Sequence, residues 1–450
     1  MTDVRRELIA RTKKSRDAYQ SSAQVLAAEV ASTIDMPHPF YVAEAHGAKI
    51  VDLDGNEYID MTMGMGPHVL GHAPDCVVEA VREAAPRGLQ YGIHNPHQET
   101  LARLITDASP ALEQVVFGNS GTEATLYAVK AARALSGKRK VGIFDGSYHG
   151  VHDYVLATPN RNSPRDAPVA FGRGAGIPED VTGQIAMLPY RDAAAFEQIR
   201  AQRDELAVVL IEPVQSSNPQ RETKAWLQEL RQVCAESGVL FVMDEVITGF
   251  RLAWGGGQEV FDLEPDLATY GKIIGGGTPV GAVAGRAELM RCFTQSRSAQ
   301  QEAGFEPVRP VFAGTTFGGN PLTMAAGAAQ LRYLRDHRDQ IYPELERQSD
   351  RLAAAINSHC ESEGIPARML NAWSMFHLVF GETEIHGSRD IQYEHLEAER
   401  EFYLHLLYHG VIIPGLHIAF LSAAHGDAEV DAIIAAFKRS FADIRERGLI

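Results

Sequence analysis

The stretch TKAWLQELRQVCAESGVLFVMDEV (223–246) decides the fold class. Its first part has the apolar spacing of an amphipathic helix that ends at Gly238, and 239–246 is apolar without alternation, as in a strand buried on both faces. LAVVLIEPV (206–214) is a second such strand, and 122–137 has the spacing of a second helix. Strands and helices that alternate in this way predict an α/β fold, with a mainly parallel central sheet covered by helices.

The two ends of the chain differ from this alternating centre. Residues 36–62 contain strand-like runs on either side of the Asp-Gly turn in DLDGNEY, which indicates a separate hairpin. After about residue 325, amphipathic helices alternate with short strands such as MFHLVFG (375–381). This part is therefore expected to form a smaller α+β domain, with a boundary near 320–335.

Composition and charge exclude several classes of protein. The 450 residues include 42 basic and 58 acidic ones, and a net charge of −16 disfavours binding to nucleic acid. No apolar run is long enough to span a bilayer, and MTDVRRELIARTKKSR (1–16) lacks the apolar core of a signal peptide. The four cysteines form no CxxC pair. We therefore expect a cytoplasmic protein that binds neither membranes nor nucleic acid.

The loop GNSGTEA (118–124) lies where an expected strand gives way to an expected helix. Ser120, Gly121 and Thr122 offer hydroxyl and backbone N–H groups at the start of that helix, an arrangement that binds phosphate. The alternative is an ordinary capped turn with Glu123 in the first helical turn. The loop alone leaves both interpretations open.

Asp244 and Glu245 end the strongly apolar strand of 239–246. A carboxylate at such a position is costly to bury without a partner, and a metal ion or a protonated nitrogen would offset that cost. A helix N-cap or a salt bridge is the alternative. Ligands in parallel sheets bind beyond the carboxyl ends of the strands, which is where both residues are expected.

Lys272 lies in DLATYGKIIGGG (266–277), between an apolar run and three glycines. A phosphate-binding P-loop would need Ser or Thr next, but Ile273 follows. The remaining alternatives are a solvated charge and a desolvated amine that attacks carbonyl groups. The three glycines favour the amine, because they let the backbone pass close to a bulky group.

A phosphate cradle, an acid that favours a cationic ring nitrogen and a nucleophilic lysine are together what pyridoxal 5′-phosphate (PLP) requires. Several segments also resemble class III PLP-dependent aminotransferases of fold type I, and the wording of KIIGGGTPVGA and FLSAAH (420–425) is similar to the glutamate-1-semialdehyde aminomutase branch. The segments that carry the resemblance are NSGTEA (119–124), YHG (148–150), EPV (212–214), DEVITGFR (244–251), GKIIGGGTPVGA (271–282) and GTTFGGNPL (314–322).

The resemblance implies a role for each matching residue. Ser120, Gly121 and Thr122 would hold the cofactor phosphate. Tyr148 would stack on the pyridine ring with support from His149, and Val246 would press on the opposite face. Asp244 would pair with the ring nitrogen, Glu212 would lie near the ring hydroxyl or the substrate, and Lys272 would carry the internal aldimine and act as the base. Thr316 would reach the phosphate of the other subunit, which implies a homodimer with shared active sites.

The resemblance also implies a large central domain and a small domain built from both chain ends. Residues 1–62 would contribute to the small domain, 63–325 would form the large PLP-binding domain, and 326–450 would complete the small one.

The expected reaction moves an amino group from an amine or amino-acid donor to a keto or aldehyde acceptor. The aminomutase branch carries an arginine before the first hairpin, whereas 29–48 contains none, and His417 stands where that branch has a glutamate. We therefore favour an aminotransferase over an aminomutase-like intramolecular transfer; a PLP-dependent lyase or an inactive binding protein of this fold is a further alternative.

Met65, Tyr91, His94 and His417 are expected to line the substrate pocket, although lone histidines and aromatic residues are often simply packed. HNPH (94–97) and HGVH (149–152) each offer two histidines without a third ligand in the sequence. We therefore expect no metal site.

Overall fold

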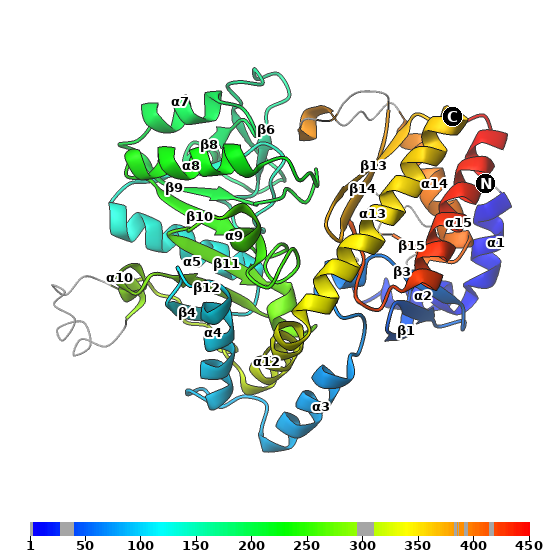
Figure 1. The fold of residues 1–450 in the computed structure, drawn as a ribbon, viewed down its shortest axis with the longest axis horizontal. Helices are drawn as coiled ribbons and strands as arrows, with labels where there is room; N and C mark the ends of the chain where they lie inside the picture. Colours follow the sequence, from blue (N-terminus) through cyan, green and yellow to red (C-terminus); the bar gives the residue numbers. More distant parts are fainter. Residues whose placement is uncertain are drawn as a thin grey trace. The chain divides into compact units, whose positions relative to one another are not determined.

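The structure is a computed structural model that describes residues 3–27, 40–294, 310–381, 385, 387–390, 395–413 and 418–450. Its contacts group into two units (Figure 1). The large unit is Cys76–Arg338 with 387–388, and the small unit is made from both chain ends, Met1–Asp75, Asp339–Ile385 and Arg389–Ile450. The division into 1–62, 63–325 and 326–450 that the sequence led us to expect stays a prediction.

The large unit is built on a seven-stranded sheet. Its strands, in spatial order, are β4 (Gln114–Gly118), β12 (Gly281–Gly285), β11 (Leu267–Gly271), β10 (Leu240–Asp244), β9 (Leu206–Ile211), β5 (Lys140–Phe144) and β8 (Ile185–Leu188). The strand β12 is antiparallel to both neighbours, whereas the pairs among β11, β10, β9, β5 and β8 are parallel. The strand direction reverses from β11 to β12 and again from β12 to β4, so β4 runs in the same direction as β11. The predicted mainly parallel sheet is confirmed.

The large unit contains helices, several of which flank this sheet (Figure 1). They are α3 (Asp75–Ala84), α4 (Pro96–Ala108), α5 (Gly121–Ser136), α6 (Glu179–Thr182), α7 (Ala194–Ala201), α8 (Lys224–Glu236), α9 (Gly256–Phe261), α10 (Ala287–Met290) and α12 (Pro321–Asp336). The large unit also has the hairpin of β6 (Ala157–Pro159) and β7 (Ala170–Gly172) and the 3₁₀ turns η2 (Ala85–Arg87), η3 (Lys272–Gly275) and η4 (Arg291–Phe293).

The segment 223–246 shows why helices cover both faces of the sheet. In β10, Val242 belongs to a core cluster that includes residues of α5. Its neighbour Phe241 is also fully buried, and the Arg231 guanidinium of α8 lies 5.8 Å from the centre of its ring. Successive side chains of a strand point to opposite faces, so α5 and α8 cover opposite faces. This explains the apolar run without polar alternation.

The small unit joins the two ends of the chain. One sheet orders β1 (Val42–His46), β2 (Lys49–Asp52), β3 (Glu57–Asp60) and β15 (Val411–Ile412), and a second orders β13 (Ala367–Ala372), β14 (Met375–Phe380) and β16 (Ala419–Phe420). The predicted hairpin is β2 with β3, and β15 lies parallel to β3. The helices are α1 (Asp3–Arg11), α2 (Lys13–Ser22), α13 (Arg338–Glu363), α14 (Leu396–Tyr408) and α15 (Asp427–Glu446), with 3₁₀ turns η1 (Met63–Met65) and η5 (Ser388–Asp390).

The core of the small unit also combines both chain ends. Val4 and Leu8 of α1 pack with Tyr58 of β3 and with Leu404 and Leu407 of α14. Among the described residues, none of the helices combines the length and the apolar character needed to cross a membrane.

Candidate active site

The predicted cofactor residues of the large unit follow the carboxyl ends of neighbouring strands. Asp244 is the last residue of β10, Lys272 follows β11 directly, and Glu212 follows β9 directly. Tyr148 and His149 come after β5. Since these strands are parallel, all five residues lie beyond the same edge of the sheet, which is where α/β proteins bind ligands.

Asp244 is buried and accepts three hydrogen bonds. Its Oδ1 accepts from the Thr269 hydroxyl at 2.9 Å and from the Val246 N–H at 3.1 Å, and its Oδ2 lies 2.7 Å from His149 Nδ1. A carboxylate has about four acceptor positions, so Oδ2 can accept one more hydrogen bond. The structure thus offers a fixed, buried carboxylate for a cationic or N–H group.

Glu245 serves a different purpose from its neighbour. Its carboxylate accepts hydrogen bonds from the N–H groups of Gly257 and Gln258, which begin α9, and from the Thr248 hydroxyl. Burial is the main cause that raises the pKa of Glu245. The capping alternative considered for the two acids therefore describes Glu245, whereas Asp244 is directed to His149.

Glu212 is buried beside Asp244 and His149. Its two oxygens accept from the Tyr148 N–H at 2.9 Å and from the Ser216 N–H at 3.2 Å. Burial raises the pKa of Glu212, and Asp244 acts in the same direction, whereas His149 lowers it. His149 Nε2 is buried and has no hydrogen-bond partner within the described part of the chain.

Lys272 begins the turn η3 in a left-handed backbone conformation, with φ of 48°. This conformation is uncommon for a residue with a side chain, and such strain is concentrated at functional sites. The residue is partly buried, and loss of hydration lowers the pKa of its amine to about 8. Asp244 and Glu212 raise this pKa, and Arg251 lowers it. The amine therefore loses its proton more readily than an ordinary lysine, and about a tenth of it is uncharged at pH 7.

We predict that Lys272 of the cofactor-free protein reacts with amine-acylating reagents at far lower pH than other lysines. The reactive form is the unprotonated amine, so its labelling should rise with pH and reach half of its maximum near pH 8, below the ordinary value of 10.5. Mass spectrometry of the labelled peptides measures this. The exposed Lys224 is the internal control, and parallel titration of the two lysines would contradict the pKa assignment.

The loop 118–124 connects β4 to α5. Ser120 is the N-cap of α5, and its hydroxyl accepts from the Glu123 N–H at 3.1 Å, as the capped-turn alternative expects. The first N–H groups of any helix have no acceptor within it, so those of Gly121 and Thr122 can still bind an anion. The two interpretations of this loop are therefore compatible.

The loop is held by close backbone contacts. A Cβ atom at Gly121 would lie 2.9 Å from Val246, and one at Gly150 would lie 2.6 Å from the Thr122 hydroxyl. A Cβ at Gly281 of β12 would lie 1.9 Å from the Ser120 carbonyl oxygen. These glycines place the loop against the strand ends that carry Val246 and Lys272.

Gly281→Ala tests this close packing. The added methyl group meets backbone that cannot rotate away, so we expect a loss of about 2–3 kcal/mol of stability and weaker retention of the cofactor. Thermal denaturation and cofactor absorbance after dialysis measure the two effects. Gly174→Ala is the matched control, because a Cβ there meets no atom within 4 Å. If both variants melted alike, the packing at Ser120 would not matter.

The other predicted residues lie in several places. Tyr148 is exposed, with the Arg173 guanidinium 5.8 Å from the centre of its ring. Thr316 is exposed, and its carbonyl oxygen accepts from Gln90. Tyr91 donates its hydroxyl to the Arg87 carbonyl oxygen at 3.0 Å, and His94 Nδ1 lies 3.3 Å from Gln98 Oε1. Met65 belongs to the small unit, in η1, and His417 lies outside the described residues.

Sequence reasoning missed Thr269, which donates to Asp244. Its partner in the sheet register is Asp244 itself, and both residues are near the carboxyl ends of their strands. A polar residue at the same level of the neighbouring apolar strand was the available signal. The direct bond between His149 and Asp244 was also not foreseen.

The fold and this strand-end chemistry define a PLP-dependent transferase of fold type I. The chain belongs to the class III aminotransferase family, since the family model described as "Aminotransferase class-III" matches residues 30–421. Its cofactor is therefore pyridoxal 5′-phosphate.

The similar proteins include some named as aminomutases and others named as transaminases or aminotransferases. The glutamate-1-semialdehyde 2,1-aminomutase of Methanocaldococcus jannaschii is 36% identical over 434 residues, which cover 95% of this chain and 98% of the relative. Among solved structures, an omega-transaminase from Sphaerobacter thermophilus superposes with a TM-score of 0.88 and 34% identity. The match covers 96% of this chain and 98% of the transaminase. A β-phenylalanine aminotransferase from Variovorax paradoxus has a TM-score of 0.83 and 30% identity, covering 98% and 96%.

Proposed function

We propose that this enzyme is an aminotransferase that moves an amino group from an amine or amino-acid donor to a keto or aldehyde acceptor, with Lys272 as the covalent anchor of its cofactor and as the base. The observation that carries the proposal is that Lys272 directly follows β11 while Asp244 ends the neighbouring parallel strand β10, so both lie beyond the same edge of the sheet. Loss of hydration also lowers the pKa of the Lys272 amine to about 8. A lysine must lose its proton to attack a carbonyl group or to act as a base near neutral pH.

The residues at the strand ends fit PLP in their chemistry. The N–H groups that begin α5 suit a phosphate. The spare acceptor position on Asp244 suits a protonated ring nitrogen, and the buried Glu212 and His149 Nε2 supply further polar groups. A Cβ atom added at either Gly121 or Gly271 would meet the side chain of Val246. Val246 therefore lies beside both glycines and supplies an apolar surface. Tyr148 is proposed for the other face of the ring, and Thr316 for the phosphate of a second subunit.

When bound, PLP supplies an aldehyde carbon for linkage to amines and an electron-withdrawing ring. In the proposed mechanism, Asp244 would face the ring nitrogen and favour its protonated form, and Thr269 and His149 hold the Asp244 carboxylate in place. Lys272 would anchor the cofactor in the resting enzyme. Its Nζ, when free and uncharged, would be the base that takes the proton from the donor carbon, and the same group would return a proton when the acceptor is aminated.

An intramolecular amino transfer is the second candidate, because the relatives with 36–37% identity include several glutamate-1-semialdehyde 2,1-aminomutases. The absence of arginine from 29–48 favours the aminotransferase. Turnover with separate donors and acceptors distinguishes the two. An aminotransferase forms a ketone or aldehyde from the donor and new amine from the acceptor in equal amounts. With the donor alone, product formation stops once each cofactor has taken up one amino group, and without the donor no new amine forms. Isomerisation of glutamate-1-semialdehyde without any external donor would favour the aminomutase.

We further propose that two copies of the chain share their active sites in the cytoplasm. Several apolar side chains near the predicted site residues of the large unit are exposed in the single chain, and a partner would cover them. They are Tyr91, Ile93, Val151 and Phe317. All four cysteines are unpaired, which suits a reducing compartment.

A further inference from the structure

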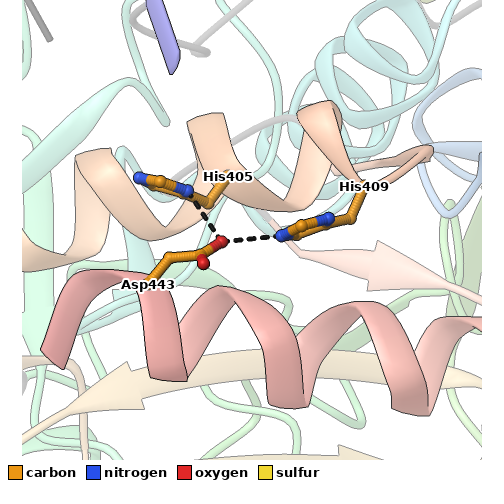
Figure 2. Close-up of side chains that lie close together, drawn as sticks. All are labelled: His405, His409 and Asp443. Carbon is orange, nitrogen blue, oxygen red and sulfur yellow. Dashed lines mark hydrogen bonds and ion pairs between the residues drawn. The ribbon is translucent and has the colours of Figure 1, made fainter. Parts of the chain in front are cut away.

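Two histidines and one aspartate of the small unit meet at a single carboxylate oxygen (Figure 2). Asp443 Oδ2 lies 2.9 Å from His405 Nδ1 and 2.6 Å from His409 Nε2. One potential ligand atom from each residue lies within 4.8 Å of the other two. None of these residues belongs to the site proposed for catalysis.

The two helices fix this arrangement. His405 lies in the last turn of α14 and His409 is its C-cap, so the two imidazoles are four residues apart and project from one side of the helix, as Figure 2 shows. Asp443 comes from the last turn of α15. Phe402 of α14 packs on Phe437 and Phe441 of α15, with ring centres 5.3 and 4.6 Å apart, so the helices that carry the three residues are firmly joined.

Electrostatics favour a cation at this position. The C-terminal end of a helix carries partial negative charge, and both α14 and α15 end close to the cluster. Of the basic residues nearby, Arg447 and Arg5 pair with the buried Glu401. Arg11 donates to the Tyr408 carbonyl oxygen at 3.3 Å. Asp443 is therefore the carboxylate that faces the two imidazoles.

Hydrogen bonding within the cluster does not use all of its polar atoms. His405 Nε2 is buried and has no hydrogen-bond partner in the part of the chain that the structure describes. Both imidazoles are directed to the same carboxylate oxygen. Each histidine is only slightly exposed, with side-chain accessibilities of 11% and 16%, which protects a bound ion from full hydration.

We propose that His405, His409 and Asp443 form a binding site for a divalent transition-metal cation of the Zn²⁺ type. Two imidazole nitrogens and one carboxylate oxygen are a ligand set that such cations accept, and three protein ligands leave a fourth position for water. Tetrahedral coordination needs ligand atoms about 3.4 Å apart, so small rotations of the three side chains suffice. Each coordinating ring nitrogen must be unprotonated, so a neutral imidazole that binds the ion would carry its proton on the other ring nitrogen.

Such an ion would fasten α14 to α15. It would bind the folded small unit and not the unfolded chain, so Zn²⁺ should raise the melting temperature in proportion to the logarithm of its concentration above the dissociation constant. The effect does not depend on the proposed aminotransferase reaction, so failure of the metal site and failure of the proposed function are separate results.

The test uses the PLP-loaded full chain, freed of any affinity tag and dialysed against chelator. Co²⁺ titration followed by visible absorption, with displacement by Zn²⁺, and calorimetric Zn²⁺ titration measure stoichiometry and affinity. We expect one ion per chain. His409→Gln and Asp443→Asn should weaken binding at least about 100-fold, since even loss of an outer-shell partner usually costs 10–100-fold.

His337→Gln is the matched control, because His337 is also the C-cap of a helix, α12, and stacks on Tyr333. It should bind Zn²⁺ as the unchanged protein does. Asp443→Asn keeps the shape of the side chain, so it remains informative if His409→Gln folds poorly. Absence of binding at about 100 µM Zn²⁺, or equal binding by the unchanged protein and the Asp443→Asn variant, would overturn the proposal.

Discussion

Replacing Lys272 with alanine should reduce amino transfer by about 10⁴-fold or more, because the variant loses both the covalent anchor and the base. The Lys272 backbone is left-handed at the end of β11, and loss of hydration lowers the pKa of its amine to about 8. Single-turnover absorbance with an amine donor measures the loss. The variant should still bind PLP through the phosphate loop, since those residues are unchanged.

Two controls make this result specific. Lys224→Ala removes an exposed lysine of the same unit and should leave the rate unchanged. Added small primary amines should restore part of the activity of Lys272→Ala, because they can supply the missing base. A Lys272→Ala variant that keeps more than about a tenth of the normal rate would show that Lys272 is neither the required base nor the required anchor.

Asp244→Asn should lower the rate of amino transfer by about 10²- to 10⁴-fold. The amide has nearly the same shape and can still meet Thr269, Val246 and His149, so the fold should persist, but it cannot stabilise a proton on the ring nitrogen. The effect should therefore appear in the proton-transfer step and much less in cofactor affinity. Stopped-flow absorbance with a donor deuterated at the reacting carbon separates the two.

Thr269→Val is the comparison for Asp244→Asn. It removes one of the three hydrogen bonds to the carboxylate and leaves the charge in place, so a loss of about 1 kcal/mol, or several-fold in rate, is expected. Equal losses in both variants would mean that Asp244 acts through packing, and that its charge has no part in the reaction.

The central sheet was predictable because burial on both faces leaves a continuous apolar run in the sequence. The segment 223–246 contains this signal together with a helix that ends at its glycine, and α8 and β10 match it within two residues at each end. The positions of Asp244 and Lys272 followed from the same rule, since carboxyl ends of parallel strands meet at one edge.

Side-chain partners were not predictable from order along the chain. Asp244 meets His149, 95 residues away, only because β5 and β10 both pair with β9. Asp244 and Glu245 are adjacent in sequence but serve different groups. His405 and Asp443 come from separate helices, 38 residues apart in the sequence, so nothing in the sequence singled out this cluster.

Borohydride reduction of the holoenzyme, followed by digestion and mass spectrometry, tests the central claim most directly, because reduction makes the link between cofactor and lysine permanent. We predict that the pyridoxyl group is found on the peptide that contains Lys272 and on no other lysine. A pyridoxyl group on a different residue, or a cofactor that washes away after reduction, would contradict the account.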